Sequence, residues 1–344
     1  MVKVRIILVG IRMKSIFISS INARSGKTVI TLGIALNSRV YTGFFKPFQE
    51  KMITINGQRV DEDAYLMQSL VDFEANPGDL CPFTRDKMPS LSMDQVMDAY
   101  RKVARDKELM IIEGMENLTM GFLYGLSTYD IVERFKSDLI LLSDSGQESL
   151  DRVAMIKDYM DYRKIPLKGV ILNLCNDVGI ENFLISKGIP VVGMIPYTPS
   201  LRTLHVFEIV EQLNGIVLTG SESLNNTVEK TLIGAMSRES ALRYFERARN
   251  KAVITGGDRS DILLSALNTS TSCIILTGGL LPSQEVINRA KFLSVPMISV
   301  KEDTLSASEI VERMIARIDP TDEKKIKTIK EEVARNVDIS KILR

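Results

Sequence analysis

Short apolar segments alternate with helix-like segments over most of the first 200 residues, and polar residues follow each apolar segment. Uninterrupted apolar strands that alternate with helices are typical of a parallel sheet with helices on both faces. The pattern therefore predicts an α/β fold. We expect its strands at residues 15–18, 40–45, 109–112, 139–142, 169–172 and 191–195.

A second, smaller series of apolar segments begins near residue 214, after the turn formed by Asn214 and Gly215. A chain of 344 residues is long enough for two domains. The series predicts a second α/β domain with strands at 216–218, 252–254, 273–276 and 296–300, and an amphipathic helix at 228–236. We therefore divide the chain into 1–13 as an extension, 14–213 and 214–320 as domains, and 321–344 as a charged helix or tail.

The first twelve residues contain a short apolar run that fits either a strand or the start of a signal peptide. The run is too short for a signal peptide and lacks a cleavage site with small residues, so export is not expected. Met13 stands directly before the first clear strand and is an alternative start to Met1.

Composition excludes several classes of function. Lys and Arg together number 44 against 43 Asp and Glu, so no basic surface for nucleic acid is expected. No segment is apolar over the length needed to span a bilayer. The three cysteines, Cys81, Cys175 and Cys273, are far apart and predict reduced thiols in a cytoplasmic protein. A single histidine, His205, disfavours a histidine metal centre or a Ser-His-Asp triad.

The loop after the first predicted strand ends in Gly-Lys-Thr and leads into a helix-like segment. In this arrangement backbone N–H groups surround a phosphate, the lysine contacts β- and γ-oxygens, and the hydroxyl binds Mg²⁺. The loop lacks the first glycine of the consensus. We expect a phosphate loop for a nucleotide, with Lys27 as a catalytic cation and Thr28 as a metal ligand. Its candidate nucleotide-binding residues are Asn22, Ala23, Arg24, Ser25, Gly26, Lys27 and Thr28.

Charged residues at other predicted strand ends are candidates for the same site. Glu113 follows an apolar strand and fits either a Mg²⁺ carboxylate or a helix cap. Asp61, Glu62 and Asp63 precede a helix, where they either cap it or supply a metal ligand. Lys46, before Pro47, is a candidate contact to phosphate or carboxylate, or a solvated lysine.

Two further groups of residues each have more than one possible role. Arg24 could reach the γ-phosphate or a neighbouring subunit, or could face solvent. In the second domain, two strands each run into Thr-Gly-Gly, and the first is followed by Asp258 and Arg259. Glycines allow close backbone approach to a ligand or another chain. The candidate ligand or interface residues are Thr255, Gly256, Gly257, Asp258 and Arg259; the alternative is a tight turn in which Asp258 pairs with Arg259.

Residues 14–200 resemble the dethiobiotin synthetase-like branch of P-loop proteins. The matching pieces are Ser25-Gly26-Lys27-Thr28, Phe45-Lys46-Pro47, Asp63-Ala64, Ile112-Glu113-Gly114, Gly169-Val170-Ile171-Leu172-Asn173 and Gly193-Met194-Ile195-Pro196. The resemblance implies Mg-ATP as ligand, with the metal on Thr28, Asp63 and Glu113. It also implies phosphate contacts by Lys27 and Lys46, an adenine contact by Asn173, and a place for Pro196 beside the nucleotide.

Residues 216–320 resemble the DRTGG domain. The matching pieces are Ile233-Gly234-Ala235-Met236-Ser237 and Thr255-Gly256-Gly257-Asp258-Arg259-Ser260-Asp261-Ile262. The order of the two domains is similar to the amino-terminal region of long bacterial phosphate acetyltransferases and to free-standing archaeal homologues. The sequence departs from true dethiobiotin synthetases in its loop, Ile21-Asn22-Ala23-Arg24, and in Met115-Glu116-Asn117 after Glu113-Gly114. No acetyltransferase catalytic domain is recognised.

These features predict a two-domain Mg-ATP-binding protein that acts as a regulatory or partner module, with slow or partner-dependent hydrolysis. One alternative is an ATP-dependent ligase that activates a small carboxylic acid or carbamate. Another is a structural partner of an acyl-transferring enzyme. A homodimer is the usual assembly for soluble proteins of this kind.

Overall fold

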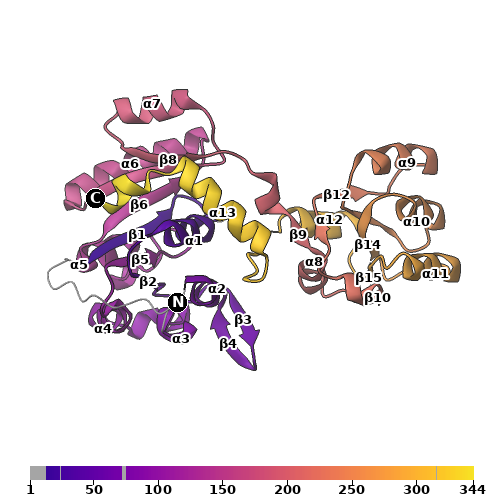
Figure 1. Cartoon of the computed structure of the whole chain (residues 1–344), viewed down its shortest axis with the longest axis horizontal. Coiled ribbons are helices and arrows are strands. Elements are labelled where there is room, and N and C mark those ends of the chain that lie inside the picture. Colours follow the sequence, from indigo (N-terminus) through magenta and orange to yellow (C-terminus); the bar gives the residue numbers. More distant parts are fainter. Residues whose placement is uncertain (1–12, 24, 72–74, 315) are drawn as a thin grey trace. The chain divides into compact units, whose positions relative to one another are not determined.

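The computed structural model describes residues 13–23, 25–71, 75–314 and 316–344 (Figure 1). The chain forms two compact units. The first runs to Tyr197 and also includes Ile318–Arg344, and the second is Thr198–Arg317. This division comes earlier in the chain than the one expected between residues 213 and 214. The extension expected at residues 1–12 lies outside the described residues.

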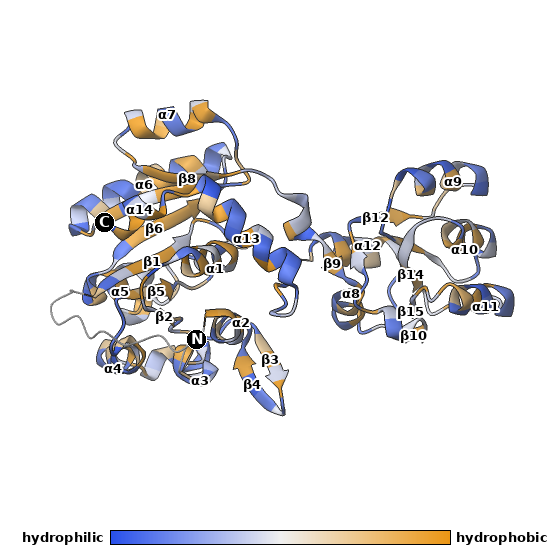
Figure 2. Cartoon of the chain, in the orientation of Figure 1, coloured by the Kyte–Doolittle hydropathy of each residue, from blue (hydrophilic) through white to orange (hydrophobic). Residues whose placement is uncertain are grey.

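The first unit is built on a parallel sheet of six strands in the order β2-β5-β1-β6-β7-β8, which confirms the predicted α/β class. The central strands are buried on both faces, and they are coloured mostly as hydrophobic in Figure 2. The strands are β1 (Lys14–Ser20), β2 (Thr42–Phe45), β5 (Leu109–Glu113), β6 (Asp138–Ser143), β7 (Leu167–Asn173) and β8 (Val191–Ile195).

Helices connect these strands, and a two-stranded hairpin follows β2. The hairpin, β3 (Met52–Ile55) and β4 (Gln58–Asp61), was not predicted from the sequence. Within the described residues, every helix is too short or too polar to cross a bilayer. The helices are α1 (Lys27–Asn37), α2 (Glu62–Val71), α3 (Pro77–Leu80), α4 (Met93–Ala104), α5 (Thr128–Phe135), α6 (Gln147–Arg163), α7 (Val178–Ser186), α13 (Glu323–Asn336) and α14 (Ile339–Leu343).

Helix α13 belongs to the first unit and packs against α1 (Figure 1). The contact is close at Gly33, where a Cβ atom would lie 2.3 Å from Val333 Cγ2. Asn37 Nδ2 donates to the carbonyl of Lys330 at 2.9 Å. The chain therefore leaves the first unit after β8, forms the second unit, and returns to cover the helix that begins at the phosphate loop.

The second unit contains a sheet of five strands in the order β10-β15-β14-β13-β12, parallel except for β10. Ala252 and Ile254 of β13 face α8 and α12, whereas Val253 faces α9, α10 and α11, so helices cover both faces. The elements are β9 (Leu204–His205), α8 (Val206–Gln212), β10 (Ile216–Thr219), β11 (Thr227–Val228), β12 (Lys230–Ile233), α9 (Arg238–Arg247), β13 (Lys251–Gly256), α10 (Ser260–Leu267), β14 (Thr271–Thr277), α11 (Gln284–Phe292), β15 (Met297–Ser299) and α12 (Thr304–Glu312).

The prediction of a helix at residues 228–236 is wrong. Lys230–Ile233 forms the edge strand β12, which pairs in parallel with Lys251–Ile254. The segment contains the β-branched residues Thr231 and Ile233, which favour strands, and hydrogen bonds to β13 outweigh its helical spacing. The helix instead begins at Arg238.

Lys251 is fully buried at the start of β13. Its Nζ donates to Thr269 Oγ1 at 2.8 Å and to the carbonyl of Ser270 at 2.7 Å. These neutral acceptors do not compensate for the loss of water around the ammonium, so burial lowers the pKa of Lys251 to about 8.

The second unit is therefore expected to gain stability as the pH rises from about 8 to 10.5, because over this range the unfolded lysine holds a proton that the folded one has lost. Replacing Lys251 with methionine removes this dependence. The free energy of unfolding of wild type, relative to that of Lys251→Met, should rise by up to about 3 kcal/mol over this range. Urea denaturation of both proteins at pH 7.5 and 10 measures the change; a constant difference would contradict the burial of a lysine with a lowered pKa.

Candidate nucleotide and metal site

The loop between β1 and α1 has the geometry of a phosphate loop. Gly26 directly precedes α1 with φ of 85°, a left-handed conformation that glycine adopts at little cost. Lys27 is buried, and its Nζ folds back to donate to Ser20 Oγ at 3.3 Å. Ser20 Oγ in turn donates to the carbonyl of Asn22 at 2.8 Å. Ser20 thus bridges the two ends of the loop.

Side chains from three other elements hold the loop in place. Asn22 Nδ2 donates to Asp144 Oδ2 at 3.0 Å and to Ser149 Oγ at 2.8 Å, and its Oδ1 accepts from Arg152. On the other side, Asn173 Nδ2 donates to the carbonyl of Ser25 at 2.8 Å. Contacts within the chain therefore hold the loop at Asn22 and at Ser25. None of Asp144, Ser149 and Arg152 was predicted, because nothing in their local sequence signals a contact with a loop more than 100 residues away.

The other residues expected around the nucleotide lie as follows. Ala23 is exposed on the loop, and Pro196 is half-buried directly after β8. Asn173 ends β7, which places it at the same edge of the sheet as the loop. Its adenine contact stays a prediction. Arg24 lies outside the described residues.

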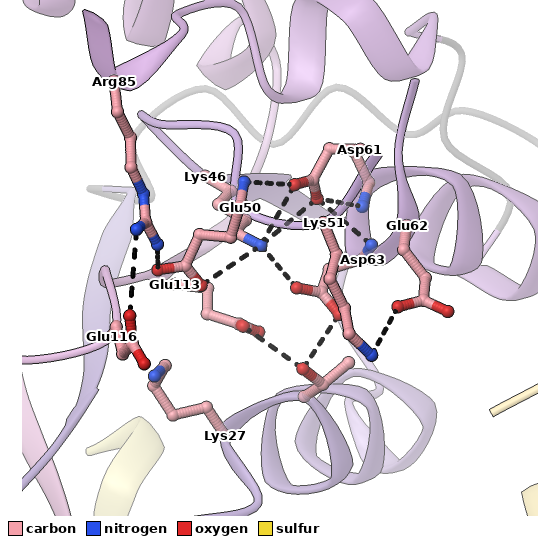
Figure 3. Close-up of polar contacts among 12 residues, drawn as sticks. Lys27, Lys46, Glu50, Lys51, Asp61, Glu62, Asp63, Arg85, Glu113 and Glu116 are labelled. Atoms are coloured by element: carbon pink, nitrogen blue, oxygen red, sulfur yellow. Dashed lines mark hydrogen bonds and ion pairs between the residues drawn. The ribbon is translucent and has the colours of Figure 1, made fainter. Parts of the chain in front are cut away.

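The three residues expected to bind Mg²⁺ come together. Thr28 Oγ1 lies 2.9 Å from Asp63 Oδ1 and 3.3 Å from Glu113 Oε1. Asp63 and Glu113 are labelled in Figure 3. Thr28 lies in the first turn of α1, Asp63 lies in the first turn of α2, and Glu113 ends β5. The fold therefore brings oxygen atoms from three distant segments to the first turn of the phosphate-loop helix.

This cluster suits a divalent cation. Glu113 is buried, and among the described residues its Oε2 has no hydrogen-bond partner. Burial, together with the nearby charge of Asp63, raises the pKa of Glu113 to about 8. A cation beside Glu113 would therefore stabilise its ionised carboxylate. No set of three His, Cys, Asp or Glu side chains in the described chain forms a metal cage. Mg²⁺ needs none, since it is commonly held by one or two carboxylates with phosphate and water.

Lys46 follows β2 and is buried among carboxylates. Its Nζ lies 2.5 Å from Asp63 Oδ2, 3.2 Å from Asp61 Oδ2 and 3.6 Å from Glu50 Oε2. Burial alone would lower the pKa of the ammonium, but the carboxylates outweigh it and hold that pKa well above its ordinary value. The same ammonium keeps the pKa of Asp63 low despite burial. The predicted contact of Lys46 with phosphate stays a prediction.

The sequence left the role of Asp61 open between a helix cap and a metal ligand. Asp61 caps α2, because its Oδ1 accepts the N–H groups of Asp63 and Ala64 at 3.1 and 3.2 Å. It is also the buried partner of Lys46, which local sequence could not reveal. Glu50 and Arg85 were likewise missed; Arg85 Nη2 donates to Glu50 Oε1 at 2.6 Å and extends the network toward the surface.

The first Thr-Gly-Gly segment of the second unit, Thr255–Gly257, follows β13 and contacts the loops at the carboxyl ends of β12 and β14. Gly257 must be glycine, since a Cβ would lie 2.0 Å from the carbonyl oxygen of Leu280. Thr255 Oγ1 donates to the carbonyl of Gly234 at 3.1 Å, and Arg259 Nη2 donates to that of Met236 at 3.0 Å. Arg259 pairs with Asp261 at 3.4 Å, rather than with Asp258 as the tight-turn alternative supposed. A ligand or interface role for this segment stays a prediction.

A strand, a glycine-containing loop and a helix that begins Lys-Thr, at the carboxyl edge of a parallel sheet, define the class of P-loop nucleotide-binding domains. Comparison with known families agrees. The chain belongs to the AAA domain family, whose model matches residues 14–204, and the model of the DRTGG domain matches residues 208–314. The predicted dethiobiotin synthetase-like P-loop domain and DRTGG domain are thereby confirmed.

Curated relatives match either the whole chain or its first part. Phosphate acetyltransferase of Synechocystis sp. is 26% identical and aligns with 91% of this chain and 49% of its own length. ATP-dependent dethiobiotin synthetase of Nitrosopumilus maritimus is 24% identical and aligns with 58% of this chain and 96% of its own length. The chain thus spans about half the length of the phosphate acetyltransferases that it matches. Among solved structures, a ParA family ATPase of Chlorobium tepidum is 13% identical, with a TM-score of 0.38 over 55% of this chain and 87% of that one.

Proposed function

We propose that the first unit binds Mg-ATP and that the chain acts as a nucleotide-dependent regulatory or partner module, with slow or partner-dependent hydrolysis. The observation that carries the proposal is the convergence of Thr28, Asp63 and Glu113 beside a phosphate loop. These side chains would hold Mg²⁺, which neutralises charge on the phosphates. Lys27 and the N–H groups at the start of α1 would bind the β- and γ-phosphates.

Two observations support a regulatory role. The relatives that match nearly the whole chain are phosphate acetyltransferases of about twice the aligned length, so an acyl-transferring enzyme is the partner we propose. In addition, the second unit lies in sequence between β8 and α13, and α13 packs on α1. A movement of α1 on nucleotide binding would therefore shift α13, and the chain connects α13 directly to the second unit. We further propose that the protein is a cytoplasmic homodimer.

A second candidate is an ATP-dependent ligase that activates a small carboxylic acid or carbamate. The match along nearly the full length of a dethiobiotin synthetase favours it. Against it stands Lys46, the cation expected to meet such a substrate, because three carboxylates surround its ammonium.

Phosphate release separates the two candidates. The protein is incubated with Mg-ATP alone and then with a panel of short carboxylic acids with bicarbonate, while thermal unfolding reports nucleotide binding. The regulatory proposal predicts stabilisation by Mg-ATP with turnover below ~0.1 s⁻¹, about 100-fold under a typical enzyme, whichever acid is added. Release that an acid accelerates by tenfold or more would favour the ligase.

A further inference from the structure

Lys46 and its carboxylates form a buried ion-pair cluster next to the proposed metal position (Figure 3). The side chains of Lys46 and Asp61 are both almost completely buried, whereas that of Asp63 is 17% exposed. Asp63 is shared between two partners: its Oδ1 accepts from Thr28 and its Oδ2 contacts Lys46. The ammonium therefore competes with any cation for this carboxylate.

Asp63 Oδ2, at 2.5 Å, is the nearest partner of Lys46 Nζ, and Asp61 is the fully buried carboxylate that shares the ammonium with it. Asp61 Oδ1 and Oδ2 lie 3.3 and 3.2 Å from Lys46 Nζ. The same carboxylate accepts the N–H of Glu50 at 2.9 Å and the N–H of Asp63 at 3.1 Å. Asp61 thus fixes the backbone on both sides of the β3–β4 hairpin. It thereby also fixes the backbone position from which the Asp63 side chain extends.

We propose that Asp61 is a positioning residue for the metal half of the nucleotide site: by retaining the ammonium of Lys46, it leaves Asp63 able to give its carboxylate to Mg²⁺. This inference rests on the proposed Mg-ATP site. Without the charge of Asp61, the ammonium has Asp63 as its closest remaining partner, since Glu50 lies farther away at 3.6 Å. Lys46 then binds Asp63 more strongly and opposes the metal.

The variant Asp61→Asn removes the charge and keeps the shape and the helix cap, because asparagine caps a helix about as well as aspartate. Its amide nitrogen cannot accept the N–H of Glu50, so that hydrogen bond is lost with the charge; the double variant below lacks the same bond and therefore separates the two effects. The protein is saturated with AMP-PNP, and thermal unfolding is followed as the free Mn²⁺ concentration is raised. We expect the half-saturating Mn²⁺ concentration to rise by about tenfold. Binding of AMP-PNP in EDTA, which does not involve the metal, should change by less than about twofold.

Glu62→Gln is the matched control. Glu62 precedes Asp63 in the first turn of α2, and its carboxylate pairs with Lys51 at 3.2 Å rather than with Lys46. This variant removes the same charge one residue away, so it should shift the half-saturating Mn²⁺ concentration by less than about twofold.

The double variant Asp61→Asn with Lys46→Met distinguishes positioning from a general structural effect. It removes the competing ammonium together with the charge that retained it, and replacement of a buried ion pair by neutral residues is often tolerated. The half-saturating Mn²⁺ concentration should return to within about threefold of wild type. A merely structural defect in Asp61→Asn would persist or worsen when Lys46 is also replaced.

Three results would overturn the inference. If Asp61→Asn behaves as Glu62→Gln, or if the double variant stays as defective as Asp61→Asn, Asp61 does not act through Lys46, while the Mg-ATP site stands as long as wild type binds AMP-PNP with Mn²⁺. If wild type itself shows no binding of AMP-PNP with or without Mn²⁺, the proposed function fails and the inference fails with it.

Discussion

Replacing Lys27 with alanine is expected to lower the affinity for Mg-ATP by more than about 100-fold, equivalent to ~2.7 kcal/mol, without unfolding the protein. Lys27 Nζ lies inside the loop, bonded to the hydroxyl of Ser20, which is a weak partner for an ammonium. Lys27 therefore contributes little to the free energy of unfolding, whereas a phosphate would be a much stronger partner for its ammonium. Isothermal titration calorimetry of the variant measures the loss.

Lys14→Ala is the matched control for this variant. Lys14 begins the same strand, β1, but its ammonium pairs with Asp138 near the surface. Its removal should leave nucleotide affinity unchanged within about twofold. Equal affinity of wild type and Lys27→Ala for Mg-ATP would show that the β1–α1 loop does not bind phosphate.

Replacing Gly33 with leucine is expected to displace α13 from α1. Even the first carbon of a side chain would lie 2.3 Å from Val333 Cγ2, and the rest of the leucine has no space in this contact. Overpacking of this kind costs ~1–3 kcal/mol of unfolding free energy, against which the better helix propensity of leucine returns less than ~1 kcal/mol. Urea denaturation measures the net loss.

A displaced α13 should also become a substrate for trypsin, because the helix carries several lysines and an arginine. Limited proteolysis should therefore cleave Gly33→Leu within residues 323–336 faster than wild type. Gly179→Leu is the control: Gly179 is an exposed glycine of α7, where an added Cβ would meet only the side chain of Asp177. Wild-type stability and proteolysis of Gly33→Leu would contradict the packing of α13 on the phosphate-loop helix.

The sequence was informative where function depends on local pattern. Apolar segments located the strands of both sheets except β12, and Gly26, Lys27 and Thr28 marked the loop. The set of Thr28, Asp63 and Glu113, which the fold brings together, was implied by the resemblance to the dethiobiotin synthetase-like branch. The residues alone left open which of Asp61, Glu62 and Asp63 joins Thr28 and Glu113.

Contacts between distant segments could not be predicted. Val333 meets Gly33 only because the chain returns after the second unit, and residues 321–344 carry no local signal of that return. The partners of Lys46 lie on both sides of a hairpin whose pairing is fixed by the fold. For β12, the helical spacing of residues 228–236 was overridden by the adjacent edge of β13.

The most direct test of the account is a calorimetric titration of wild-type protein with ATP in the presence and absence of Mg²⁺. The arrangement of Lys27 in the loop and of Thr28, Asp63 and Glu113 beside it predicts one site per chain for Mg-ATP and markedly weaker binding when EDTA removes the metal. Absence of binding heat at several temperatures, with no thermal stabilisation by Mg-ATP, would contradict the central claim that this unit binds nucleotide.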